Sequence, residues 1–130
     1  MRINNGKPGD IHPPAGSYSH SITIPGNSEL VFVSGQVGMR PDGSIPESFA
    51  EQAELVFRNL DAVLHANGLV ANDIVKMTTF IVKGQAGEVV RDARAKYLDA
   101  HRPASTAVYV EALVAPELLL EVECIAVRLL

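Results

Sequence analysis

The chain has 130 residues, of which 47% are hydrophobic and 20% charged; this composition excludes a disordered or collagen-like chain and predicts a single domain over residues 1–130. Its formal net charge is -4, the opposite of the balance that phosphate-backbone binders carry, so nucleic acid is an unfavourable partner. The single cysteine excludes an intrachain disulfide. We expect a cytoplasmic protein without a signal peptide or membrane span, because no apolar run approaches the roughly 20 residues that a span needs.

The N-terminal part of the chain predicts an irregular segment followed by two strands. Residues 1–16 are polar, rich in glycine and proline, and without hydrophobic periodicity, so we expect no regular structure there. Residues 17–24 and 30–34 have strand composition, and the Pro-Gly-Asn sequence at 25–27 is a turn signal. The short gap between the two runs predicts a hairpin.

The clearest predicted element is a helix over residues 48–67. Ser48 and Glu51 have the spacing of a capping box, and Gly68 is a typical stop signal. Apolar residues recur at helical spacing in between, which predicts one buried stripe. The stripe consists of Phe49, Ala53, Val56, Leu60, Val63 and Leu64.

The remainder of the chain predicts a strand at 74–82, a helix at 88–100, and strands at 105–113 and 118–129. Two helices and about five strands in this order favour an α+β fold, with both helices packed on one face of a mixed sheet. The other face of that sheet must then be solvated or covered by another subunit.

Two carboxylates and two strand segments are the candidates for chemistry. Glu121 and Glu123 lie two residues apart on the last strand, so they share a face with aliphatic neighbours. A carboxylate among apolar groups suits a general acid, whereas a solvated strand edge explains the same pattern without chemistry. Ser34-Gly35 ends a buried strand, where a ligand can approach the backbone; the alternative is a bend in which the serine hydroxyl is hydrogen-bonded. Tyr18 shares a strand face with His20, and the alternative for this pair is an exposed strand edge.

The sequence gives no support for a metal or cofactor. The histidines are scattered, and Cys124 has no nearby partner, so we expect no metal and interpret the cysteine as a core residue. No phosphate-binding glycine motif or nucleophile-elbow motif occurs, so we expect no cofactor.

From about Pro13 to Leu129 the chain resembles the RidA/YjgF family of small imine deaminases, also known as L-PSP endoribonuclease-like proteins. The resemblance lies in the order and spacing of short segments, each weak alone. They are Gly16-Ser17-Tyr18-Ser19, Val33-Ser34-Gly35-Gln36-Val37-Gly38, Pro41-Asp42-Gly43, Asn59-Leu60, Ala62-Val63-Leu64, Gly68, Asp73-Ile74-Val75-Lys76, Thr79-Phe80, Pro103-Ala104 and Glu121-Val122-Glu123-Cys124-Ile125-Ala126-Val127.

The resemblance implies a chorismate-mutase-like fold that assembles as a homotrimer, with its sheets inside, its helices outside, and small-molecule pockets in the clefts between subunits. It also implies hydrolysis of reactive enamines and imines to 2-keto acids and ammonia. Carried onto this sequence, the pocket includes Tyr18, Ser34, Gly35 and Glu123. Glu123 positions water or moves a proton, and Ser34 and the backbone near Ala107 hold the substrate.

One position departs from the family pattern. Active members have an arginine directly after the Pro-Ala pair, where it binds the substrate carboxylate through two hydrogen bonds. This chain has Ser105 there, and the loss of a charged hydrogen bond costs about 1.5–3 kcal/mol. Arg91, on the second predicted helix, is a candidate replacement or else a solvent-facing residue, and Arg40 and Arg102 have weaker grounds.

Three functions follow from the resemblance. The first is an imine or enamine deaminase that has rebuilt its carboxylate-binding site. The second is a relative without deaminase activity that binds or transforms a different small metabolite in the intersubunit cleft. The third is a ribonuclease or translation inhibitor, which the net charge of -4 disfavours.

Overall fold

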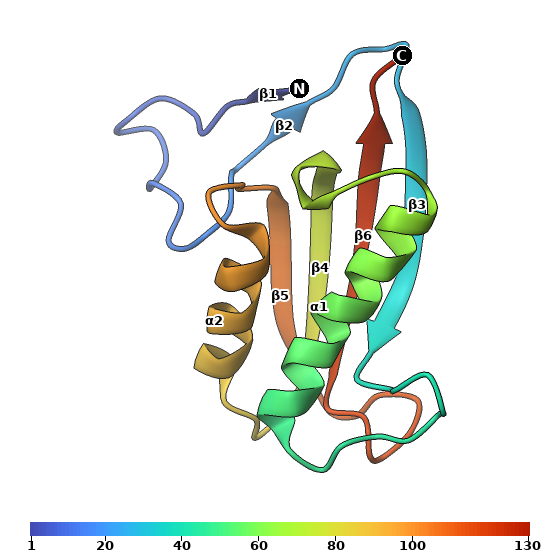
Figure 1. Ribbon diagram of the computed structural model, residues 1–130. Coiled ribbons are helices and arrows are strands. Elements are labelled where there is room, and N and C mark those ends of the chain that lie inside the picture. Colours follow the sequence, from blue (N-terminus) through green and yellow to red (C-terminus); the bar gives the residue numbers. More distant parts are fainter.

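The computed structural model describes all 130 residues and shows a four-stranded sheet with two helices on one of its faces (Figure 1). The strands lie in the order β3-β6-β4-β5; β4 and β5 run parallel, and the other neighbours run antiparallel. This arrangement confirms the predicted α+β fold with a mixed sheet. The strands are β3 (Glu29–Val37), β4 (Ile74–Val82), β5 (Ala104–Val110) and β6 (Leu120–Arg128).

Helix α1 (Phe49–Ala66) begins and ends where the sequence predicts. The hydroxyl of Ser48 accepts a hydrogen bond from the backbone N–H of Glu51 at 3.3 Å, and Gly68 adopts the left-handed conformation after the last turn (φ +71°). The predicted stripe faces the sheet. Ala53, Val56, Leu60 and Leu64 are fully buried, and Phe49 and Val63 pack against them.

Helix α2 (Gly87–Leu98) lies beside α1 on the same face of the sheet (Figure 1). Val90 and Leu98 are buried and fix the helix against the core. The helix ends two residues before its predicted end, because Asp99 adopts a positive φ of 53° that a helix does not accommodate.

The predicted hairpin between residues 17–24 and 30–34 is wrong. Only Ile22–Thr23 form a strand in the first run, and this strand, β2, pairs with β1 (Arg2–Ile3) within the segment that we expected to be irregular. Ser19 instead forms a bridge to Ala104. The segment that contains Ser19 therefore lies along β5, at one edge of the sheet, whereas β3 forms the other edge.

The face of the sheet opposite the helices is uncovered. Phe32 on β3 is 72% exposed and Val108 on β5 is 40% exposed, although both lie in regular strands.

A short 3-10 helix, η1 (Ala71–Asp73), precedes β4 and was not predicted. None of the helices is both long and apolar enough to cross a membrane.

Candidate functional site

Ser34 and Gly35 form an irregularity in β3, at the point where it passes β6. The pairing register shifts between Val33 and Gln36, so Ser34-Gly35 lies outside the regular ladder. A Cβ atom built on Gly35 would overlap the carboxylate of Glu121. Gly35 is therefore needed for close approach, and a carboxylate lies directly against this backbone.

Glu121 and Glu123 do share the open face of the sheet, as predicted. Their neighbours Leu120, Val122 and Cys124 are buried beneath the helices, so the alternate glutamates point away from the core. The two differ in surroundings: Glu121 is half-buried against Gly35, whereas Glu123 is exposed. The sequence pattern favoured Glu123 through the family resemblance, and it gave no signal that Glu121 contacts Gly35.

Tyr18 lies near the start of β5, because the adjacent Ser19 forms a bridge to Ala104. Its hydroxyl accepts a hydrogen bond from the Ala15 N–H at 3.1 Å. Its ring lies edge-on to that of His20, with the ring centroids 5.7 Å apart. The adjacent Ser19 N–H donates to Pro103 O at 3.1 Å. Tyr18 therefore lies beside the Pro-Ala segment that precedes Ser105.

The hydroxyl of Ser105 is buried and has no hydrogen-bond partner. Ser105 is paired with Met77 in the parallel β4–β5 ladder, and paired residues in such a ladder project to the same face. Since Met77 is fully buried in the core, Ser105 projects beneath the helices.

Arg91 and Ala107 lie together at the edge of the sheet. Both line a cavity of about 210 Å³ between α2 and β5, together with Arg94 and Thr79. Arg91 was predicted from the sequence, whereas Arg94 was missed, although its i+3 spacing from Arg91 puts both on one helix face. Arg40 is elsewhere, paired with Glu51 at 3.3 Å.

Within one chain, the predicted residues fall into separate groups. Glu123 is in register with Thr78 and points to the open face, whereas Ala107 is in register with Thr79, which is fully buried on the helix side. Residues on opposite faces of one sheet cannot surround the same small molecule. A pocket that uses both groups requires a second copy of the chain.

Cys124 has the environment of a core residue. Burial, reinforced by the charge of Glu123, raises the pKa of its thiol to about 12, so the thiolate that a nucleophile or metal ligand needs is disfavoured at neutral pH. No group of three or more His, Cys, Asp or Glu side chains is arranged to hold a metal ion.

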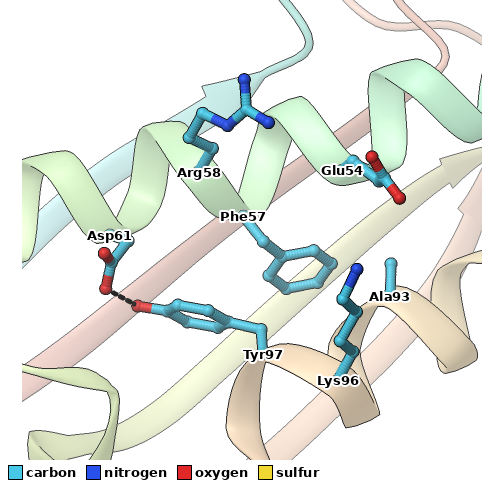
Figure 2. Close-up of a pocket in the computed structure, with 7 residues that line it drawn as sticks. All are labelled: Glu54, Phe57, Arg58, Asp61, Ala93, Lys96 and Tyr97. Carbon is cyan, nitrogen blue, oxygen red and sulfur yellow. Dashed lines mark hydrogen bonds between the residues drawn. The ribbon is translucent and has the colours of Figure 1, made fainter.

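A larger cavity, of about 330 Å³, lies between the two helices (Figure 2). Phe57 and Tyr97 contribute its aromatic surface, with ring centroids 5.6 Å apart, and the Tyr97 hydroxyl donates to Asp61 Oδ1 at 2.8 Å. Burial and the neighbouring Asp61 raise the pKa of Tyr97. None of the predicted site residues lines this cavity.

Comparison with known proteins identifies relatives over nearly the whole chain. The Reactive Intermediate Deaminase A of Arabidopsis thaliana chloroplasts is 34% identical over 113 residues, which are 85% of this chain and 58% of that protein. The crystal structure of Escherichia coli TdcF with bound serine superposes with a TM-score of 0.71 and 33% identity, and covers 98% of this chain and 99% of TdcF.

The Yersinia pestis protein YyfB, described as a Rid-family protein of unknown function, superposes with a TM-score of 0.82 and 27% identity, over 96% of both chains. The family model described as Endoribonuclease L-PSP matches residues 10–128. The chain therefore belongs to the endoribonuclease L-PSP family, which is the RidA/YjgF family.

Proposed function

We propose that this protein hydrolyses reactive enamines or imines to 2-keto acids and ammonia, in clefts between the subunits of a homotrimer. The observation that carries the proposal is the contact between the Glu121 carboxylate and the Gly35 backbone on the open sheet face. It places a potential proton acceptor beside a backbone segment that is free of the regular strand pairing. The deaminase name of the Arabidopsis relative and the serine bound to TdcF support a small amino-acid-derived substrate.

The chemistry requires a base and a place for the substrate. Water adds to the carbon of the C=N bond while a carboxylate accepts one of its protons; the nitrogen gains protons, the C–N bond breaks, and ammonia leaves as the carbonyl forms. Glu123 is the base that the family resemblance implies. The contact with Gly35 favours Glu121, because that carboxylate already lies where Ser34 and Gly35 would hold a substrate.

Assembly supplies the rest of the pocket. The open face exposes apolar side chains of ordered strands, including Phe32 and Val108, and large exposed apolar patches commonly mark interfaces. We propose that a trimer burying this face also brings the α2–β5 edge of one subunit to the glutamates of the next. Tyr18 belongs to the same proposed junction, because the adjacent Ser19 bridges to Ala104 at the start of β5.

Arg91 takes the role of the missing strand arginine. Ser105 is neutral and its hydroxyl is buried, so it cannot form a bidentate pair with a carboxylate. Arg91 is exposed on α2 and lines the same cavity as Ala107. We therefore place the substrate carboxylate at Arg91, with the Ala107 backbone beside it.

Small imines are favoured over RNA as substrates by charge. The net charge is -4, and an RNA-cleaving surface generally needs a concentration of positive charge along a groove. A filter-binding assay at low salt tests this exclusion, and salt-sensitive RNA binding would contradict it.

The decisive experiment follows hydrolysis of 2-iminopropionate, generated from alanine by an amino-acid oxidase and trapped as its semicarbazone. We expect the wild type to accelerate imine loss, Arg91→Gln to reduce the acceleration about 10- to 100-fold, and Arg58→Gln, on the outer helical face, to leave it unchanged. Comparison of Glu121→Gln with Glu123→Gln identifies the base. If the wild type does not accelerate imine loss but Ser105→Arg does, Arg91 has not replaced the carboxylate-binding arginine.

The trimer is tested separately by sedimentation equilibrium. We expect a mass of about three chains at micromolar concentration. A monomer would exclude the intersubunit site.

A further inference from the structure

Two unpaired arginines share one cavity at the α2–β5 edge. Arg91 and Arg94 both line the space of about 210 Å³, and neither takes part in any of the three ion pairs of the structure. The Nε atom of Arg94 is buried and has no hydrogen-bond partner. A buried guanidinium nitrogen without an acceptor is costly, because arginine retains its charge and its donors in proteins.

The electrostatic surroundings increase that cost. Burial, and then the positive charges of Arg91 and Arg102, lower the pKa of Arg94. None of these three arginines forms an ion pair with a carboxylate, and Arg102 donates to the backbone oxygens of Asp99 and His101, at 2.7 and 3.0 Å. An anion in the cavity would relieve both the repulsion and the unsatisfied donor.

A third polar group points to the same conclusion. Thr79 is fully buried, lines the cavity, and its hydroxyl has no hydrogen-bond partner. Such orphaned groups are rare in folded proteins, and a bound ligand would supply the missing partner. The cavity is smaller than the roughly 300–1,000 Å³ of sites for drug-sized ligands, and its volume of about 210 Å³ suits a small metabolite.

We propose that this cavity recognises a short-chain substrate with two anionic groups, one held by Arg91 and the other by Arg94 and the Thr79 hydroxyl. The inference rests on the proposed function for the site of reaction, and it names the substrate class as the imine of a dicarboxylic amino acid. One guanidinium fork satisfies one carboxylate. A single carboxylate, such as that of an alanine-derived imine, would leave the second cation unpaired.

The test measures binding without catalysis, by titration calorimetry with stable keto acids. 2-Oxoglutarate and 2-oxopentanoate have the same chain length and differ in the second carboxylate. We expect 2-oxoglutarate to bind the wild type about 10- to 100-fold more tightly. 3-Phosphoglycerate, which has one carboxylate and one phosphate, distinguishes a dicarboxylate site from a phosphate site; tighter binding of this compound would overturn the dicarboxylate assignment.

The variants assign the preference to residues. Arg94→Gln should abolish the preference for 2-oxoglutarate, Arg94→Lys should keep part of it, and Thr79→Val should reduce it by several-fold. Arg58→Gln, which leaves the cavity unchanged, should bind like the wild type. Equal affinities of the wild type for the two five-carbon acids, or a preference that survives Arg94→Gln in a folded protein, would overturn the proposal.

Hydrolysis is measured in parallel, with imines formed from glutamate and alanine by appropriate oxidases. Selective binding of 2-oxoglutarate without hydrolysis of either imine would contradict the proposed function and leave the dianion site standing. Hydrolysis of both imines at equal efficiency, without selective binding, would overturn the dianion site and support the proposed function.

Discussion

The substitution Gly35→Ala is expected to separate stability from activity. The added Cβ overlaps the carboxylate of Glu121, so that side chain must move. Glu121 takes part in none of the ion pairs and is only half-buried. A strained rotamer costs about 0.5–1.5 kcal/mol, so we expect the free energy of unfolding to fall by about 1 kcal/mol.

The effect on catalysis should be larger. Displacement of a reacting group by about 1 Å can cost on the order of 100-fold in rate, and a Cβ in van der Waals contact requires at least that movement. We therefore expect Gly35→Ala to reduce imine hydrolysis by about 100-fold, measured above the spontaneous rate by semicarbazone trapping. The corresponding change in Tm, by differential scanning fluorimetry, is about 2–8 °C for each kcal/mol.

Gly38→Ala is the matched control. Its added Cβ would lie 2.8 Å from the backbone Cα of Gln52, and Gln52 is held by hydrogen bonds to Pro46 O, Glu117 O and the Leu119 N–H. Because this neighbour cannot rotate away, overpacking should cost about 1–3 kcal/mol. The reasoning is refuted if Gly35→Ala keeps full activity, which would also favour Glu123 as the base.

Three further outcomes follow from the core and from the helix pair. Leu60→Ala removes a fully buried side chain of α1 and should lower the free energy of unfolding by about 2–5 kcal/mol in urea titrations; a loss below 1 kcal/mol would contradict its central place in the core. Tyr97→Phe removes the 2.8 Å hydrogen bond to Asp61 (Figure 2) and should cost about 1.5 kcal/mol in the same assay, and an unchanged urea midpoint would contradict that contact. Because burial raises the pKa of Cys124 from its ordinary value near 9 to about 12, the protonated thiol stabilises the folded state below pH 9, and this contribution is lost as pH rises from about 9 to 12; Cys124→Ala should lessen the alkaline loss of stability, and an identical pH profile for the variant would contradict it.

The sequence was informative wherever local signals and packing agreed. Ile74–Val82 was predicted with both ends correct, and the Ser48 cap gave the start of α1. The hairpin prediction was wrong because the composition of a short strand does not indicate which other strand it pairs with. Ile22–Thr23 had strand composition, but its partner β1 lies about twenty residues earlier and was hidden in a segment of glycine and proline.

The site was less predictable, since it depends on register and on the spaces between elements. Alternation placed Glu121 and Glu123 on one face, but the contact of Glu121 with Gly35 arises from the irregular register of β3 against β6. Arg94 was overlooked for a similar reason. Helical spacing shows that it shares a face with Arg91, but not that its Nε atom is buried without an acceptor.

The proposed transfer of the carboxylate-binding charge from a strand to a helix would change what determines specificity. At position 105 an arginine would be fixed by the β4–β5 ladder, whereas Arg91 and Arg94 are positioned by the packing of α2. Val90, 2% exposed, adjoins Arg91 and anchors that turn to the core. A helix can present two guanidinium groups three residues apart to one cavity, while successive residues of a strand alternate between faces. Under this proposal, two helix arginines in place of one strand arginine suit a substrate with two charges better than one with a single carboxylate.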